Sequence, residues 1–356
     1  MRHYYIRFFC ILFISLAANS CITPYNPDLG SAQTRIVIEG IISTLPGPQK
    51  VRITQSSVYT NGSEGTNIGI TGAHVYVTDD IGNRIDYMDI GTGNYETDAF
   101  VQGIIGRSYQ LHVITPDDKE YISEPDLLKP VPQIDNIYWE YNREKKEINV
   151  YLDLTDAPTP GDGYLWKWQH YEKLTYCKYS EVVALPNGGS TWTLCRECCT
   201  NCWDIIQCRS CVNIASDQYV NGNKIKKQLI TSVPYSDYTP YYLLIEQRSL
   251  TSNAYAFWNS VKAQTSSTGG PFDAAPAPIV GNIKNIADAK EKVLGFFGAS
   301  DIIQRPYWQE RNQIDDTPNP VQPPYCAPVT GPPPVCFECI EGAGYRTSFQ
   351  PPGWDR

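Results

Sequence analysis

The sequence predicts a mainly β protein made of two consecutive β-rich domains, and three observations support this fold class. Apolar and polar residues alternate with a period of two in many short segments, which is the pattern of half-buried strands. Residues that favour turns and strands are abundant, with 27 prolines, 26 glycines and 25 tyrosines. The chain has 356 residues, of which 42% are hydrophobic, enough to bury one large or two moderate cores.

The first domain is expected at residues 35–128 as a β-sandwich. Its strands are predicted where the alternation is clearest, at residues 35–42, 49–59, 73–79, 84–90 and 108–116. The sequences "DDIGN" and "GTGNY" predict turns between them. The order of the "DxxGN" turn, the Gly93-Asn94-Tyr95 step and the strand at Tyr109 resembles the transthyretin-like or carboxypeptidase-regulatory type of sandwich. That resemblance implies a module that binds or spaces and does not catalyse.

A boundary is predicted where Pro125, Pro130 and Pro132 interrupt regular structure. The second domain, residues 129–317, is expected to be β-rich and fibronectin-like. Its strands are predicted at residues 136–141, 147–156, 163–174, 226–233 and 241–250, and residues 291–308 are expected to close the same sheet as two more strands.

One helix is predicted in the second domain, starting near residue 251. Its apolar residues recur at helical spacing and share one face: Ala254, Phe257, Trp258 and Val261. Thr251 or Ser252 can cap its first turn. The glycines at 269 and 270 are expected to end it before a proline.

Two places in the second domain could contact a ligand. Trp166 and Trp168 lie on one face of the strand at 163–174 and could stack on a sugar ring, but we favour a core-facing aromatic strand. The loop "PFDAAPAPIVGNI" offers Phe272 and Asn282 for recognition. We favour a structural brace there, because Pro and Asn in such a loop serve backbone geometry first.

A cysteine-rich insertion is predicted at residues 177–211, where "TLCRECCTNCWDIIQCRSC" holds six cysteines in nineteen residues. A further CxxC, Cys336 to Cys339, lies in a Pro/Cys-rich tail at 318–356, so we expect the tail to be covalently attached. Zinc fits the CxxC spacing. However, an exported chain meets an oxidising compartment, and the gap from Cys202 to Cys208 is short for paired zinc knuckles.

Structural disulfides are therefore favoured over zinc, redox and iron–sulfur roles, and no metal is assigned. The disulfide candidates are Cys177, Cys195, Cys198, Cys199, Cys202, Cys208, Cys211, Cys326, Cys336 and Cys339.

The first twenty residues have the pattern of an export signal. Arg2 and Arg7 precede an apolar run that is too short to span a bilayer. The sequence "LAANS" then leads into Cys21, which resembles the lipobox of bacterial lipoproteins. This implies cleavage of residues 1–20, acylation of Cys21 and a tether at 21–34, so that the lipid anchors the chain to the membrane. Plain secretion with Cys21 in a disulfide is the alternative.

The net charge and the motifs that are missing limit the classes of function that the chain can have. The formal net charge of −9 becomes −11 once Arg2 and Arg7 are removed (−9 − 2), which argues against nucleic acid as a partner. No HExxH, GxSxG or phosphate-binding loop is present. His74, His112 and His170 are expected to be sheet residues and not ligands. We expect no enzymatic activity and no cofactor.

Several motifs resemble one family. They are the "SNAYAFW" helix, the "PFDAAPAPIVGNIKN" loop, the "VLGFF" strand and the opening "RIVIEGIISTLPGPQKVRIT". They are similar to the domain-of-unknown-function 4249 family of Bacteroidetes outer-membrane lipoproteins. The resemblance implies a non-enzymatic binding or accessory module that works with a TonB-dependent receptor in nutrient uptake, on a face of the outer membrane left undecided. An envelope hydrolase acting on glycan or peptide between the domains, and a purely structural surface protein, are the alternatives.

Overall fold

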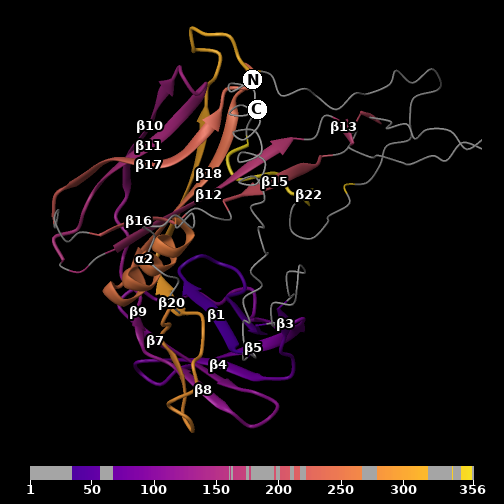
Figure 1. Cartoon of the computed structure of the whole chain (residues 1–356), viewed down its shortest axis with the longest axis vertical. Coiled ribbons are helices and arrows are strands. Elements are labelled where there is room, and N and C mark those ends of the chain that lie inside the picture. The colour runs from indigo at the N-terminus through magenta and orange to yellow at the C-terminus, as the bar shows by residue number, and fades with distance from the viewer. Residues whose placement is uncertain are drawn as a thin grey trace, which may run out of the picture.

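The structure is a computed structural model that describes residues 34–56, 67–159, 161, 163–173, 176–177, 196–197, 201–208, 212–216, 222–266, 279–319, 339 and 346–354. It is mainly β, as the sequence predicts, with two β-sandwich units and the helix α2 (Ser252–Ser266) beside them (Figure 1). Among the described residues no helix is long and apolar enough to cross a bilayer.

The N-terminal unit is one continuous sheet path that folds into two facing layers. Its strands are β1 (Ile36–Ser43), β2 (Lys50–Gln55), β3 (Ile68–Gly69), β4 (His74–Asp79), β5 (Arg84–Gly91), β6 (Asn94–Glu96), β7 (Ser108–Ile114), β8 (Glu120–Ser123), β9 (Asp126–Leu127), β19 (Ile283–Asn285) and β20 (Phe297–Ser300). The path runs β19-β8-β7-β4-β5-β6-β2-β1-β20, with β3 on β2 and β9 on β7. β5 joins the layers, because its first half pairs with β4 and its second half with β6.

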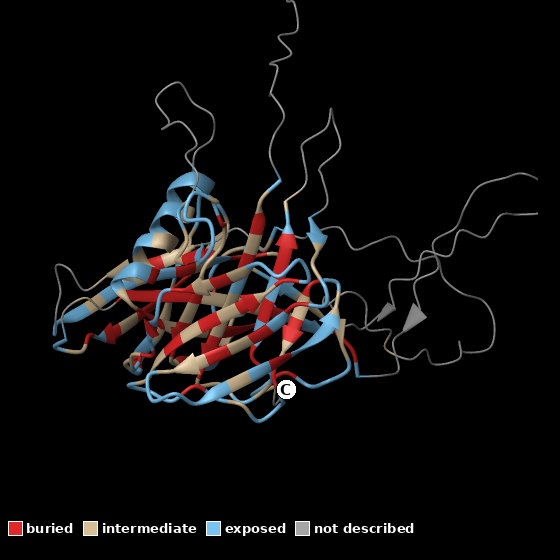
Figure 2. Ribbon diagram, turned by 90° about the horizontal axis from the view of Figure 1, so that it is seen from below, coloured by how far each residue is buried: buried red, intermediate tan, exposed pale blue. Residues whose placement is uncertain are grey.

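The period-two pattern of the sequence produces the core of this unit. Along β7 the buried residues Tyr109, Leu111 and Val113 alternate with less buried neighbours, and Ile36 and Ile38 do the same on β1. These side chains belong to one apolar cluster between the layers. The same alternation of buried and more exposed residues is visible along the strands in Figure 2.

The sequence places residues 291–308 in the second domain, and here the structure differs. β20 pairs in parallel with β1, and β19 pairs with β8, so both strands belong to the N-terminal sheet (Figure 1). The expected boundary of 129–317 is therefore wrong for residues 283–300. Phe297 and Ala299 complete the N-terminal core. Alternation identifies a strand without identifying the sheet that receives it.

A glycine permits this return of the chain to the first unit. Gly295 has a φ of 95°, in the left-handed region. A Cβ at this position would lie 2.1 Å from the carbonyl oxygen of Ile38. The backbone before β20 can therefore approach β1 only because residue 295 has no side chain.

The second unit is a sandwich of a three-stranded and a six-stranded sheet. The smaller sheet contains β10 (Ile134–Asn142), β11 (Glu147–Thr155) and β17 (Lys224–Pro234). The larger contains β21 (Ile302–Gln309), β18 (Tyr241–Leu250), β12 (Gly163–Lys173), β15 (Trp203–Gln207), β22 (Arg346–Thr347) and β16 (Asn213–Ser216). A separate pair, β13 (Tyr176–Cys177) and β14 (Arg196–Glu197), lies in the predicted insertion.

The larger sheet is covered on both faces. One face packs on β11 and β17 in a core that includes Tyr164 and Trp166. The other carries Leu165 and Leu250, which pack against Ala254 of α2.

The helix α2 begins as predicted, and its first turn is capped. The Thr251 hydroxyl accepts a hydrogen bond from the backbone N–H of Ala254 at 3.2 Å. Its predicted apolar face also turns inward, since Ala254 is buried and Phe257, Trp258 and Val261 are half-buried.

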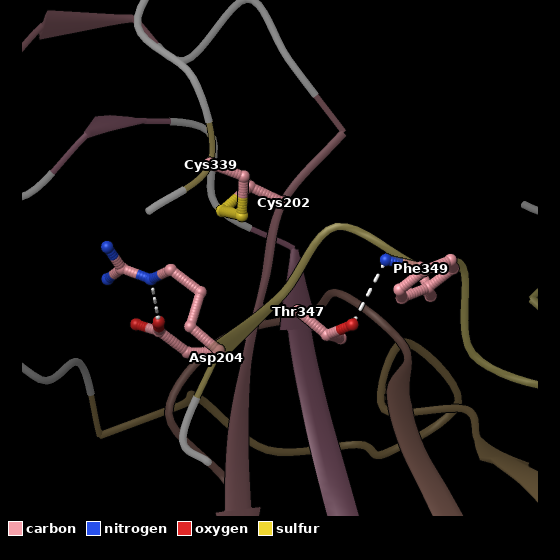
Figure 3. The surroundings of a disulfide bond; sticks show 6 residues. Cys202, Asp204, Cys339, Thr347 and Phe349 are labelled. Atoms are coloured by element: carbon pink, nitrogen blue, oxygen red, sulfur yellow. Dashed lines mark hydrogen bonds and ion pairs between the residues drawn. A yellow bond between two sulfur atoms is a disulfide. The ribbon is translucent and has the colours of Figure 1, made fainter. Parts of the chain in front are cut away.

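The tail is attached to the larger sheet, as the sequence predicts. A disulfide joins Cys202 to Cys339, and near it the Arg346 guanidinium lies 2.7 Å from the Asp204 carboxylate (Figure 3). β22 pairs with β15. Trp354 then packs into an aromatic cluster, with ring centroids 4.8 Å from Trp308 and 5.3 Å from Tyr242.

Candidate functional site

Two buried or half-buried carboxylates connect the two units. Asp126 of β9 is buried and accepts hydrogen bonds from the Thr251 hydroxyl at 2.6 Å and from the backbone N–H of Ala299 at 2.8 Å. It thereby joins the N-terminus of α2 to β20. Burial raises the pKa of this carboxyl, and the two hydrogen bonds oppose that shift.

Asp301, which lies between β20 and β21, makes the second connection between the units. Its carboxylate accepts hydrogen bonds from the Thr44 hydroxyl at 2.6 Å and from the backbone N–H of Val131 at 2.9 Å. Its own backbone N–H donates to the Ser249 hydroxyl at 2.9 Å, and that hydroxyl donates to the carbonyl of Lys129 at 2.6 Å. We call the region where the two units meet the junction. Its closed side is the part formed by the following residues and the partners given above: Thr44, Asp126, Ser249, Thr251 and Asp301.

Next to the closed side the units separate and leave a pocket of about 630 Å³. One wall is the outward face of β1, β2 and β6 in the N-terminal unit. The other is the outward face of β12 and β18 together with α2. Gly298 and Ser300 of β20 contribute to the lining, so the pocket borders the closed side directly.

The wall of the second unit is largely apolar. Leu165 and Leu250 contribute from the sheet, and Phe257 and Trp258 from α2. The Phe257 ring stacks on Phe296 with centroids 4.8 Å apart and meets Trp258 edge to face at 5.6 Å. This wall offers a pre-packed aromatic surface, the usual lining of a small-molecule pocket.

Three of the six charged side chains that line the pocket form ion pairs. Lys50 lies 2.8 Å from Glu96 on the N-terminal wall. On the opposite wall Arg248 lies 2.6 Å from Glu246, whose second carboxylate oxygen accepts a hydrogen bond from Gln304 at 3.2 Å. Both oxygens of Glu246 are therefore occupied.

Among the described residues Glu39, Arg52 and Lys167 have no ion-pair partner, and of these three only Lys167 is half-buried. It stands opposite Glu246 in the register of β12 and β18, but Arg248 and Gln304 engage that carboxylate. Within the described part of the chain the Lys167 side chain forms no ion pair or hydrogen bond, and its Nζ lies 5.5 Å from the Trp258 ring centroid. Burial, the largest cause, and the neighbouring Arg248 lower the pKa of Lys167 to about 8, while Glu246 and Glu39 oppose the shift.

The sugar-stacking alternative is wrong for Trp166. Its side chain has 0% exposure and lies in the core of the second unit, where its indole N–H donates to the Gln247 side chain at 2.8 Å. Trp168 is half-buried against the same core. The aromatic face of β12 is therefore core, which is the interpretation favoured from the sequence.

Asn282 acts as a brace. Its side-chain N–H donates to the carbonyl of Phe297 at 2.7 Å, and its side-chain oxygen accepts from the N–H of Phe297 at 3.0 Å. The amide thereby extends the hydrogen bonding of β20 and has no polar atom aimed at the pocket. Phe272 and Cys21 lie outside the described residues.

The disulfide prediction is confirmed for Cys202, Cys208 and Cys339. Cys202 and Cys339 form a disulfide, and Cys208 is also disulfide-bonded. Cys177 belongs to β13 by its backbone. The remaining candidates, Cys195, Cys198, Cys199, Cys211, Cys326 and Cys336, lie outside the described residues. In the described part of the chain no group of three or more metal-ligating side chains is arranged around a common point.

All three histidines lie on strands, as expected. The His170 Nδ1 lies 2.7 Å from the carbonyl oxygen of Tyr242, and its ring stacks on Tyr241 at 3.7 Å. Burial lowers the pKa of His170 to about 4. His112 stacks on Tyr76 at 4.6 Å and is half-buried. His74 on β4 is exposed.

Sequence reasoning missed the pocket and its central lysine. The available signal was the position of Lys167 between Trp166 and Trp168, a cation on the outward face of an aromatic strand. What covers that face comes from residues far away in the sequence, namely Glu39 of β1 and Trp258 of α2. A single strand pattern could not bring them together.

The fold and the junction define a class of protein: a mainly β chain of two interleaved sandwich units with a small-molecule-sized pocket between them. A family model described as "Domain of unknown function (DUF4249)" matches residues 22–305, so the chain belongs to this family. No curated protein matches the chain.

Two solved structures show limited likeness. A two-domain fibronectin type III segment of chicken tenascin is 11% identical, covers 60% of this chain and 91% of its own, and has a TM-score of 0.18. A Salmonella alpha-2-macroglobulin mutant is 10% identical, covers 81% of this chain and 15% of its own, and has a TM-score of 0.19.

Proposed function

We propose that the chain is a lipid-anchored, non-enzymatic binding protein of the outer membrane. In this proposal it is attached through Cys21, holds a small ligand in the pocket between its units, and supports nutrient uptake by a TonB-dependent receptor. The observation that carries the binding role is the pocket of about 630 Å³ with its aromatic wall. Concave, mostly apolar sites of this size with a few polar groups are the usual form of ligand sites.

The arrangement of acidic groups in the pocket favours binding over hydrolysis. Its lining carboxylates, Glu39 of β1 and Glu96 of β6, stand on the same wall, and Glu96 is paired with Lys50. A hydrolase acting on glycans needs two carboxyl groups that flank the scissile bond. The opposite wall presents Lys167 and Arg248, whose positive side chains bind negatively charged groups.

The sequence supports the membrane and receptor parts of the proposal. The charge-then-apolar signal and the lipobox resemblance predict acylation at Cys21, and fourteen residues at 21–34 would tether the anchored cysteine to the folded units. Multiple acyl chains hold a protein on a membrane durably, since each buried methylene contributes about 0.8 kcal/mol. The receptor partner follows from the family resemblance.

Co-purification from solubilised outer membranes tests this proposal. The tagged full chain is expected to fractionate with the membrane, to incorporate labelled palmitate and to co-purify with a TonB-dependent receptor identified by mass spectrometry. The matched Cys21→Ala chain is expected to lose all three properties. Equal membrane retention of both chains would contradict the anchor, and equal receptor recovery from both would contradict the partnership.

A further inference from the structure

We propose that the pocket between the units binds a small organic anion with an aromatic or apolar body, and that Lys167 is the residue that holds its negative charge. The inference rests on the proposed binding role and names the class of ligand. It does not depend on the lipid anchor or on the receptor.

The first argument is the missing counter-charge. A charged group removed from water is normally paired, because an unpaired one loses hydration without compensation. Lys167 is half-buried and lacks an ion-pair partner within the described residues, since Arg248 and Gln304 engage Glu246. An anion in the pocket would supply the contact that the fold leaves open.

The second argument is the local balance of charge. The residues lining the pocket include four basic side chains, Lys50, Arg52, Lys167 and Arg248, and two acidic ones, Glu39 and Glu96. Counting Glu246 behind Arg248 still leaves an excess of one positive charge (4 − 3). The whole chain has a formal charge of −9, so this basic excess is local to the pocket.

The groups that face Lys167 come from three elements. Glu39 approaches from β1, Glu246 and Arg248 from β18, and the Trp258 ring from α2. Glu39 is exposed and belongs to the opposite unit, so it can remain hydrated while a ligand lies against β12. Arg248 is positioned to assist Lys167 as a second positive charge.

The third argument is the shape of the apolar wall. Phe257, Trp258 and Phe296 form a continuous ring surface beside the ammonium group. An aromatic body can pack on this surface while its charged group reaches Lys167. The closed side of the junction positions both walls before any ligand arrives, which limits the ordering required on binding.

A pair of probes with the same ring body tests the inference. The anion is 1-anilinonaphthalene-8-sulfonate and the neutral analogue is N-phenyl-1-naphthylamine, which lacks the sulfonate. Both would be titrated by fluorescence and calorimetry into the purified chain from residue 22 onward. We expect one saturable site that binds the anion at least about tenfold more tightly than the neutral analogue, the effect of a charge-assisted contact.

Variants assign the charge to Lys167. Lys167→Met should reduce anion affinity about tenfold and leave the neutral analogue unchanged, while Lys167→Arg should keep most of the preference for the anion. Lys145→Met removes an exposed lysine elsewhere and should change neither affinity. Phe257→Ala should weaken both probes by a similar factor, which separates recognition of the body from recognition of the charge.

Three results would overturn the inference: no saturable binding of the anion, equal affinity for both probes, or unchanged anion affinity in Lys167→Met. Circular dichroism checks that each variant is folded, and if Lys167→Met were not, Lys167→Gln would be used. Because these titrations use a chain without lipid or receptor, they can fail while the co-purification succeeds, and the reverse.

Discussion

The two sides of the junction between the units both include residues of β18 and β20, but their charged groups differ in whether the protein itself supplies a partner. On the closed side, Asp126 and Asp301 each accept two hydrogen bonds from the protein itself. In the pocket beside it, Lys167 has no such partner among the described residues. The closed side therefore stabilises the arrangement of the units, while the pocket retains an interaction for a ligand to complete.

This division of roles has a physical cause. A buried polar group that is fully hydrogen-bonded rigidifies its surroundings, whereas an uncompensated one lowers stability. A fold that keeps such a group beside a cavity needs stabilising interactions elsewhere to offset the lost stability. The hydroxyls of Thr44, Ser249 and Thr251 supply them, because each joins segments that are far apart in the sequence.

The largest expected effect tests whether the junction depends on the tail. The double variant Cys202→Ser/Cys339→Ser should lower the free energy of unfolding by about 2–4 kcal/mol, because the disulfide constrains an unfolded chain across 137 residues. Urea unfolding measures this change. Affinity for the naphthalene sulfonate probe should stay within about twofold, since neither cysteine lines the pocket.

Two results would contradict this expectation. An unchanged free energy of unfolding would mean that the aromatic cluster around Trp354 holds the tail without covalent help. A large loss of probe affinity would mean that the tail and the junction form one cooperative unit.

The next effect concerns the closed side itself. Asp126→Ala should lower the free energy of unfolding by about 2–3 kcal/mol, because the Thr251 hydroxyl and the Ala299 N–H would lose a buried acceptor. Thermal unfolding measures it. The control Asp86→Ala removes an exposed partner of Arg84 and should cost less than about 1 kcal/mol. Similar losses in both variants would show that the buried carboxylate has no special role.

Several features of the fold follow from local sequence. The alternation around Leu111 specifies a half-buried strand, and Thr251 is a good helix cap beside the apolar spacing of α2. The CxxC that ends at Cys339, together with the oxidising compartment expected from the export signal, predicts an attached tail. Each of these depends on residues close together in the sequence or on a covalent rule. The predicted strand at 241–250 coincides with β18 for the same reason.

The partners of each element could not be predicted in the same way. Phe297 has the pattern of a strand, but its pairing with Gly40 of β1 depends on the close approach allowed by Gly295. Strand alternation puts Lys167 on the face of β12 opposite Trp166. That Trp258 and Glu39 would enclose it depends on how α2 and β1 meet, which local periodicity does not contain.

The smallest expected effect is a gain in stability, and it tests directly whether Lys167 lacks an ion-pair partner. Lys167→Met should raise the free energy of unfolding by on the order of 1 kcal/mol at about pH 7, because it removes a half-buried charge without an ion-pair partner among the described residues and keeps most of the side-chain length. Urea unfolding without ligand measures this. A loss of stability instead would show that Lys167 already has a stabilising partner.

The pH dependence of this gain identifies its source. The pKa of Lys167 is lowered from its ordinary value of 10.5 to about 8 in the folded chain, so between these pH values the unfolded chain binds more protons. Stability of the unsubstituted protein therefore rises with pH across this window. The advantage of Lys167→Met should be largest below about pH 8 and should narrow towards about pH 10, where folded Lys167 is mostly neutral. Lys145→Met should show no such narrowing, and an advantage independent of pH would assign the gain to packing and not to charge.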